Sequence, residues 1–307
     1  MANLRDIKRR IDSVTSTKQI TRTMEMVSTA KIRRALEAAQ AAAPYKEAIT
    51  EMLSNVASAR SGLQVPLLET HDEIRRAVLI VIASDRGLAG GFNMVQQRTA
   101  EAKMNELKAT GAEVEIIACG RKPHDYFRYR GIEPVLSFVG ISSEPTMEEA
   151  TQIASYVTDG YSKGTIDLVM LYYNHARNRV DQDQVVEQLL PIGDAFRVPS
   201  KPRTKEAITE LEESPVNPSE SDFTFDPSPN AVLGYLLPAY IRTVIYHALL
   251  DSAAAEHGAR RRAMKSATDN ATEVITTLNR KYNRIRQGSI TTELNEIVGG
   301  AAALEEM

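Results

Sequence analysis

The first sixty residues constrain the fold of this chain most strongly. From Asn3 to about Ala59 there is no Gly, and Pro44 is the only Pro. The first apolar residues recur at intervals of three and four positions, at Leu4, Ile7, Ile11 and Val14. This spacing predicts a helix with one apolar stripe. A helix of fifty-odd residues is a rod of roughly 80 Å, and so narrow a stripe requires a partner helix or a sleeve.

Two irregularities are predicted within this helix. The apolar stripe resumes at Ile20, Met24 and Val27 after a local slip in phase, and such slips change how tightly a coiled coil winds. Pro44 predicts a kink or a break, because Pro removes a backbone donor and its ring collides with the preceding turn.

A second very long helix is predicted at the other end of the chain. Beyond Pro238, which fits an early turn or causes a bend, the helical pattern persists to Ala303. The expected stripe comprises Ile241, Ile245, Leu249, Ala255, Ala259, Val274, Leu278, Ile285, Leu294, Ile297 and Leu304. The N-terminal rod is its expected partner, and small residues over Ser252–Ala271 allow the two backbones to approach closely.

The middle of the chain alternates between strand and helix patterns. Strands are expected at Ala77–Ala83, Val114–Cys119, Val135–Val139 and Ile166–Tyr173, with one more at Gln184–Pro191. Helices are expected between them, at Phe92–Thr110, Lys122–Arg130 and Thr146–Ser162. This alternation predicts a mostly parallel sheet with right-handed crossovers.

These patterns divide the chain into four expected parts. Residues 1–60 are an N-terminal coiled-coil helix and residues 75–195 a central Rossmann-like α/β domain. Residues 196–230 are an acidic, Pro-rich connection, and residues 231–307 are a C-terminal coiled-coil helix. The expected fold is therefore α/β, with a long antiparallel two-helix coiled coil formed by both chain ends.

Charge and composition exclude several classes of protein. The net charge of −3 argues against a protein that coats nucleic acid, and the single Cys119 excludes an intramolecular disulfide framework. The first residues lack the apolar core of a secretory signal. The apolar stretch Ala231–Leu250 contains Pro238, Arg242 and His247, so a soluble helix is expected there rather than a membrane span.

Basic residues gather at both ends of the chain. Residues 1–60 hold 11 Lys and Arg against 6 acids, net +5, and residues 260–290 hold 8 against 2, net +6. Such ends favour an acidic partner surface, although two solvated helix faces give the same pattern.

Residues for catalysis are not apparent. There is no GxxxxGK[ST] phosphate loop, and the five His residues have no metal-site spacing. The Gly-rich segment SDRGLAGGFN (84–93) follows a predicted strand and opens a helix, which is the context of a nucleotide loop. Its GxxGG spacing instead favours tight packing of a turn. We therefore expect no catalytic, cofactor-binding or metal-binding residues.

Several segments resemble one known family, the gamma subunit of the rotary F-type ATP synthase, of bacterial type. SDRGLAGGFN is similar to one family signature, and ITTELNEIVGGAAAL (290–304) matches the other hallmark. The opening segment 4–35 looks like the family's N-terminal helix, and 267–275 and 283–291 are similar to further family segments. Ala89 stands where the signature often has Cys, and the Cys pair of chloroplast members is missing.

The resemblance implies a non-catalytic rotor shaft. In such proteins the two end helices form an antiparallel coiled coil inside a hexamer of alpha and beta subunits. The α/β domain lies at the membrane-proximal base, against the epsilon subunit and the c-subunit ring. Expected roles are coupling of proton flow to ATP synthesis or hydrolysis and an influence on ATPase regulation, at the cytoplasmic face of the plasma membrane. No nucleic-acid partner and no intrinsic membrane span are expected. The alternative is a stand-alone nucleotide-binding α/β protein with coiled-coil adaptor ends.

The resemblance also assigns residues. The implied contacts to the catalytic hexamer are Met24, Arg286, Gln287, Thr291, Glu293 and Glu296, with Arg10 and Arg22 as additional donors. The implied apical bearing is Gly299, Gly300, Ala301 and Leu304, and the implied foot at the c ring is Phe223, Phe225 and Asp226. The signature turn contains Ser84, Asp85, Arg86, Gly87, Gly90 and Gly91. In the coiled coil we expect residues near Met24 to lie close to residues near Leu278.

Overall fold

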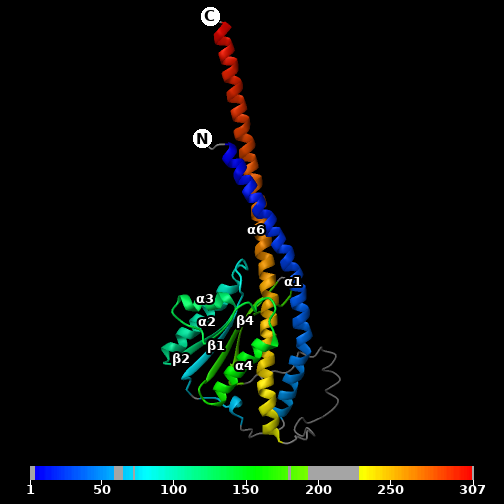
Figure 1. Cartoon of the computed structure of the whole chain (residues 1–307), viewed down its shortest axis with the longest axis vertical. Helices are drawn as coiled ribbons and strands as arrows, with labels where there is room; N and C mark the ends of the chain where they lie inside the picture. Colours follow the sequence, from blue (N-terminus) through cyan, green and yellow to red (C-terminus); the bar gives the residue numbers. More distant parts are fainter. Residues whose placement is uncertain (1–3, 59–64, 72, 179–180, 193–227, 306–307) are drawn as a thin grey trace, which may run out of the picture. The chain divides into compact units, whose positions relative to one another are not determined.

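The computed structural model describes residues 4–58, 65–71, 73–178, 181–192 and 228–305. In chain order its elements are α1 (Leu4–Ser58), η1 (Pro66–Leu68), β1 (Arg76–Ile82), α2 (Phe92–Ala109), β2 (Glu113–Cys119), α3 (Arg121–Tyr129), β3 (Leu136–Phe138), α4 (Met147–Ser162), β4 (Leu168–His175), β5 (Asp183–Leu190) and α6 (Pro229–Glu305) (Figure 1). The chain forms two compact units. Unit 1 comprises residues 1–29 and 260–307, and unit 2 comprises residues 30–259. The two long helices, α1 and α6, each contribute residues to both units.

Unit 2 contains a five-stranded sheet in the order β3-β2-β1-β4-β5. Strands β1, β2, β3 and β4 run parallel to one another, and β5 pairs antiparallel with β4 at one edge. The central strand β1 is buried along nearly its whole length, which explains its continuous apolar sequence. The predicted strands and helices of the middle segment are confirmed, with ends that differ by one or two residues.

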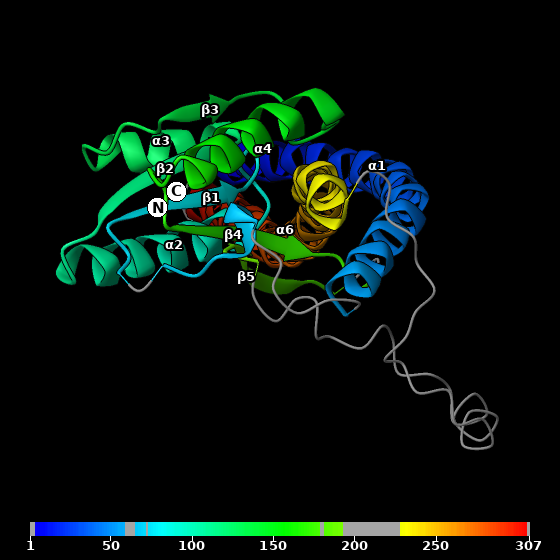
Figure 2. The same cartoon turned by 90° about the horizontal axis from the view of Figure 1, so that it is seen from below.

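Helices cover both faces of this sheet. Ala77, Leu79 and Val81 of β1 share a core with residues of α2 and α3, including Met104 and Phe127. The alternate residues Val78, Ile80 and Ile82 face a larger core that contains residues of α4, α6 and α1, including Ile153, Ile241 and Leu53. Figure 2 shows these helices around the sheet. Unit 2 is therefore a three-layer α/β unit.

The apolar start of α6 belongs to this second core. Among the described residues α6 is the one helix long and apolar enough to cross a membrane, by length and composition only, and 50% of its most apolar window is buried. Leu233, Leu237, Val244 and Ile245 are each at most 1% exposed. Packing on the sheet accounts for the apolar character of this segment.

Unit 1 is an antiparallel pair made by the start of α1 and the end of α6 (Figure 1). The contact is fixed at one point by the Thr21 and Thr268 hydroxyl groups, which lie 2.7 Å apart. The α1 seam consists of buried and half-buried residues at Ile7, Ile11, Val14, Lys18, Thr21 and Ser28. The α6 seam has the same spacing, at Met264, Thr268, Ala271, Ile275, Leu278, Tyr282 and Ile285. The predicted fold class, an α/β domain with a two-helix coiled coil, is confirmed.

Two details predicted for the seam are wrong. The apolar stripe does not slip at Ile20, because the seam continues in phase through Thr21 and Ser28 while Ile20 and Val27 are 61% and 52% exposed. Small polar residues occupy the seam there, so a search for apolar residues finds the neighbouring face. Val274 is likewise 43% exposed, and the α6 seam passes through Ile275.

Of the kink or break predicted at Pro44, the break is not found. Helix α1 continues through Pro44 to Ser58. Pro44 is exposed, whereas Ala39 and Ile49 on either side of it are buried. Burial of the flanking turns keeps the helix continuous across the one position where a backbone donor is missing.

The expected proximity of Met24 and Leu278 is wrong as well. The pair is antiparallel and fixed at Thr21 and Thr268, so a residue a given number of positions before Thr21 lies opposite the residue the same number of positions after Thr268. Ten positions before Thr21 is Ile11, and ten positions after Thr268 is Leu278. Leu278 therefore lies opposite Ile11. Met24 lies on the other side of the Thr pair, about 20 Å from Leu278 along the helix axis.

Candidate functional site

The Gly-rich segment after β1 is a compact turn closed by its own side chains. Ser84 is fully buried, and its backbone N–H and its hydroxyl both donate to Asn93 Oδ1 at 2.8 Å. The Ser84 hydroxyl also lies 2.5 Å from the carbonyl oxygen of Arg86. Asn93 lies in the first turn of α2, so these bonds fix the end of β1 to the start of the following helix.

The Asp85 carboxylate joins the ends of three strands. Its Oδ1 accepts from the backbone N–H of Arg121, after β2, and of Gly140, after β3, both at 2.8 Å. Its Oδ2 accepts from the N–H of Ser142 at 3.0 Å, and the Asp85 N–H donates to Ser142 Oγ at 3.1 Å. Burial raises the pKa of Asp85, but these hydrogen bonds outweigh it, and the pKa is lowered from its ordinary value.

Two glycines around this turn have a conformational reason. Gly120 has φ +108°, and an added Cβ would lie 2.3 Å from the carbonyl oxygen of Ala83. Gly90 has φ +61° with open space around it. Leu88 has φ 64°, an unusual value for a residue other than Gly, and is 63% exposed. Gly87 and Gly91 have ordinary φ values and no close neighbour at the Cβ position.

This geometry bears on the nucleotide-loop alternative. In a nucleotide-binding α/β fold the phosphate lies at the carboxyl edge of the sheet, on the N–H groups of the Gly-rich loop and of the start of the next helix. Here the N–H groups of Arg121, Gly140 and Ser142 are taken by Asp85. The chain itself supplies the anion at this edge, as expected of a packed turn.

A second polar cluster lies where β4 meets α6 in unit 2. Asp251 is 4% exposed; it is hydrogen-bonded to His175 Nδ1 and accepts from the Ala176 N–H at 3.1 Å. His247 lies one turn before Asp251, and its Nδ1 has no hydrogen-bond partner among the described residues. Burial, and then the charge of Lys46, lowers the pKa of His247. Sequence reasoning missed this cluster, because His175 and Asp251 are 76 positions apart and no motif spacing links them.

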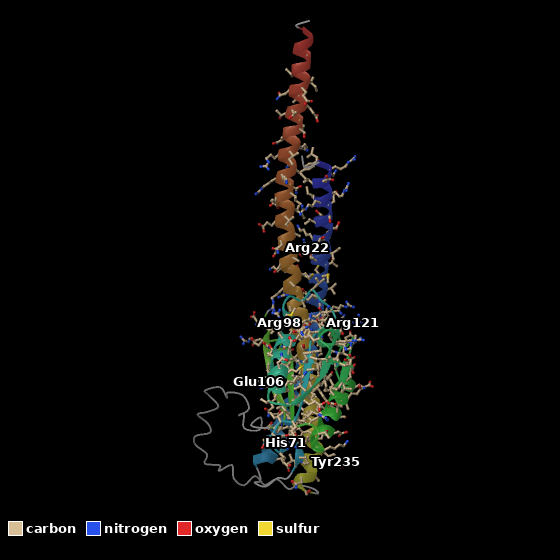
Figure 3. All side chains as sticks on the ribbon, turned by 90° about the vertical axis from the view of Figure 1, so that its left-hand side faces the viewer. Arg22, His71, Arg98, Glu106, Arg121 and Tyr235 are labelled. Carbon is tan, nitrogen blue, oxygen red and sulfur yellow. The ribbon has the colours of Figure 1, made fainter. Side chains whose placement is uncertain are left out.

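The residues assigned by resemblance to the catalytic hexamer all lie in unit 1. Met24 is half-buried beside the seam. Arg10 and Arg22 are exposed on α1, and Figure 3 shows Arg22 on this helix. Exposed residues of α6 complete the set, namely Arg286, Gln287, Thr291, Glu293 and Glu296. The Thr291 hydroxyl donates to the carbonyl oxygen of Gln287 at 2.9 Å.

The remaining assigned residues are described only in part. Gly299 and Ala301 are exposed on α6. Gly300 and Leu304 lie within α6. Phe223, Phe225 and Asp226 lie outside the described residues.

The end of α6 carries exposed apolar side chains. Ile290, Leu294, Ile297 and Val298 are 49%, 55%, 69% and 63% exposed. The register fixed at Thr21 and Thr268 places Leu4, the first described residue of α1, opposite Ile285. No described α1 residue therefore reaches these side chains. Sequence reasoning included Leu294 and Ile297 in a stripe but missed Ile290 and Val298.

Figure 3 shows the two ends of unit 2 through its labelled side chains. Arg98 and Arg121 lie at the end where β1 and β2 finish, and His71 and Tyr235 lie at the opposite end. At that opposite end His71 Nδ1 lies 2.7 Å from Asp167 Oδ1, and Asp167 also accepts from the N–H groups of Arg75 and Arg76. The ring of His71 stacks on Tyr161.

Comparison with known proteins agrees with this architecture. The family model described as ATP synthase matches residues 3–304. The ATP synthase gamma chain of Pelotomaculum thermopropionicum is 43% identical over 305 residues, which cover 99% of this chain and 100% of that protein. A chain in the Euglena gracilis mitochondrial ATP synthase matches with a TM-score of 0.62 and 17% identity, over 98% of this chain and 94% of that one. A chain in the Tetrahymena thermophila mitochondrial ATP synthase central stalk and c-ring matches with a TM-score of 0.55 and 22% identity, over 81% and 99%. At these identities the two structures support the fold, whereas the whole-length family match and the 43% identical relative establish that this chain belongs to the ATP synthase gamma-chain family.

Proposed function

We propose that this chain is the central rotor shaft of an F-type ATP synthase, which couples transmembrane proton flow to ATP synthesis and hydrolysis. A gamma chain is a non-catalytic rotor subunit, and the catalytic sites of the complex lie on the beta subunits. The chain's role is mechanical: rotation of an asymmetric shaft biases which conformation each catalytic subunit holds.

The uncovered apolar end of α6 carries this proposal. Four large apolar side chains between Ile290 and Val298 are about half or more exposed, on a part of α6 that no described residue of α1 reaches. A helix with such a face needs a groove or a sleeve to cover it. The proposed cover is the apolar interior of a hexamer of alpha and beta subunits.

Charge supports the same partner. Arg10 and Arg22 on α1 and Arg286 on α6 are exposed, and the two ends of the chain have net charges of +5 and +6. Acidic loops on the catalytic subunits would complement these ends and orient the contact. Met24, Gln287, Thr291, Glu293 and Glu296 are the further proposed contacts.

The last turns of α6 are the proposed apical bearing. Gly299, Gly300, Ala301 and Leu304 are small or apolar residues without charge. Such side chains slide past an apolar collar without forming fixed ion pairs. The proposal therefore expects a charge at this level to impair rotation or assembly.

The central α/β domain is the proposed foot of the rotor, against the epsilon subunit and the c-subunit ring. Phe223, Phe225 and Asp226 stay the proposed contacts to the ring. The chain has a place in a membrane-associated complex through its family, and its proposed site is the cytoplasmic face of the plasma membrane, as a peripheral component. The alternative of a stand-alone nucleotide-binding protein is not favoured, because the family match covers residues 3–304 and the 43% identical relative is an ATP synthase gamma chain.

The test is substitution of the uncovered stripe in the assembled enzyme. The double variant Leu294→Asp/Ile297→Asp places two charges in the proposed sleeve, and we expect ATP synthesis by membrane vesicles to fall at least about tenfold. The control is Gln152→Asp, an exposed position of α4 outside the assigned contacts, for which we expect a change below about twofold. Equal activity of the double variant and the control would refute the sleeve contact.

Two further substitutions test the assigned contacts separately. Arg286→Ala with Gln287→Ala should lower the turnover of the assembled complex, and unchanged turnover would remove these residues from the contact. Gly300→Asp should impair assembly or rotation, and normal assembly with normal turnover would end the bearing interpretation.

A further inference from the structure

A partly enclosed cleft of about 300 Å³ lies within unit 2, between α1, α6 and the loop that joins β3 to α4. Helix α1 contributes Lys31, Arg34, Ala35 and Ala38, the loop contributes Ser143, Glu144 and Pro145, and α6 contributes Tyr246, Leu250, Ala253 and His257. The volume equals that of about ten water molecules in the liquid and lies at the lower end of the range for small-molecule sites.

The inner part of this cleft is mostly apolar. Leu250 and Ala253 are 5% and 4% exposed and form its floor. On the α1 side the lining includes Ala35, which is half-buried, and Ala38, which is exposed; Pro145 lines the loop side. The small alanines leave room that larger side chains would fill, so an apolar group of a ligand has surface to bury here.

Two cations line the α1 side of the same cleft. Lys31 is half-buried and Arg34 is exposed. In the described part of the chain, no carboxylate forms an ion pair with either of them within 4.0 Å. The one carboxylate among the described lining residues is that of Glu144, so the lining has an excess of positive charge.

We infer that this cleft binds a small amphipathic carboxylate, whose anionic group pairs with Lys31 and Arg34 and whose apolar chain packs on Leu250 and Ala253. The combination of an apolar floor with a few convergent polar groups is typical of small-molecule sites. Two neighbouring cations favour a carboxylate over a neutral group of the same shape. The inference does not depend on the role of the chain as a rotor, because it rests on unit 2 alone.

The test uses the full-length chain and three matched probes: octanoate, 1-octanol and octylammonium. Isothermal titration should find octanoate the tightest of the three. The variant Lys31→Gln/Arg34→Gln should weaken octanoate binding about fivefold, a factor that corresponds to two solvent-exposed charge contacts, and should leave 1-octanol binding unchanged. Octanoate that binds no more tightly than 1-octanol, or not at all, would overturn the inference.

A second variant tests the location of the site. Ala38→Phe places a ring in the cleft and should abolish binding of both octanoate and 1-octanol. The control Ala41→Phe adds the same ring at an exposed position of α1 outside the described lining and should leave binding of both probes unchanged. Octanoate that binds Ala38→Phe as well as the native chain would place the binding elsewhere and contradict the assignment.

Discussion

The hydroxyl oxygens of Thr21 and Thr268 lie 2.7 Å apart, although 247 positions separate the two residues in the sequence. Each oxygen also lies within hydrogen-bond distance of a carbonyl oxygen of its own helix, 3.0 Å from that of Lys18 for Thr21 and 2.9 Å from that of Met264 for Thr268, so one hydroxyl donates across the pair and the other donates to its own helix. This pair sets the register of the two chain ends in unit 1. A polar pair in a largely apolar seam specifies one register at some cost in stability.

Asp85 should be essential to the stability of unit 2. The variant Asp85→Asn replaces a charged acceptor of three backbone N–H groups with an amide, one half of which donates. We expect the free energy of unfolding to fall by about 2–4 kcal/mol, measured by urea denaturation at pH 7. The control Asp125→Asn, an exposed residue of α3, should change it by less than about 0.5 kcal/mol.

The contribution of the Asp85 carboxylate to folding stability should depend on pH. Because the pKa of Asp85 is lowered in the folded state, its contribution is fully present above the ordinary pKa of about 3.8 and is lost as the pH falls through the lowered value. The stability difference between the native chain and Asp85→Asn should therefore shrink only in strong acid. A difference that disappears already near pH 6 would contradict this role.

Gly120→Ala should be far more damaging than a similar change at a glycine in open space. A Cβ at Gly120 would meet the Ala83 carbonyl at 2.3 Å, whereas at Gly131, which also has positive φ, nothing lies within 4 Å. We expect losses of about 3 kcal/mol for Gly120→Ala and about 1 kcal/mol for Gly131→Ala in the free energy of unfolding. Equal losses would contradict a role for the Cβ contact with the Ala83 carbonyl, because they would show that the positive φ alone determines the loss in free energy of unfolding.

His247 should make unit 2 less stable in mild acid. The pKa of His247 is lowered in the folded state, so the unfolded chain binds a proton more readily, and stability falls as the pH drops below the ordinary value of 6.5. His175, Asp251 and Lys46 are the charged groups that act on it. In His247→Phe this loss should be absent, as measured by urea denaturation at pH 7.5 and pH 5.5. Parallel pH profiles of the two proteins would contradict the assignment.

The sequence predicted the elements of this fold better than their contacts. The central strand and the helices beside it have local apolar periods, so β1 and α2 were predictable to within one or two residues. The register of unit 1 was not, because Thr21 and Ser28 occupy the seam while the apolar Ile20 lies outside it. Apolar residues beside a seam recur in the sequence with the same helical period as residues within it, so periodicity alone does not tell the two apart.

The candidate site was predictable in position but not in mechanism. The Gly-rich turn was expected where it lies, because it follows β1 and opens α2. The hydrogen bonds of Asp85 to Arg121, Gly140 and Ser142 join parts of the chain 36 to 57 positions apart, and no local pattern reveals them. The contact of His175 with Asp251 arises in the same way, from the packing of α6 on the sheet.

The most direct test of the shaft is a pair of cysteine cross-links in the assembled enzyme. Thr21→Cys with Thr268→Cys should oxidise to an intrachain disulfide in high yield, since the two hydroxyl oxygens that the sulfur atoms would replace lie 2.7 Å apart and a disulfide needs its side chains this close. ATP synthesis should persist, because both residues belong to one turning body. Native Cys119 is buried, and burial raises its pKa, so it should not react.

Met24→Cys with Leu278→Cys, about 20 Å apart along the axis, should not cross-link. Efficient cross-linking of this second pair and not the first, or loss of activity on closing the first, would contradict an axle built from the two chain ends in this register.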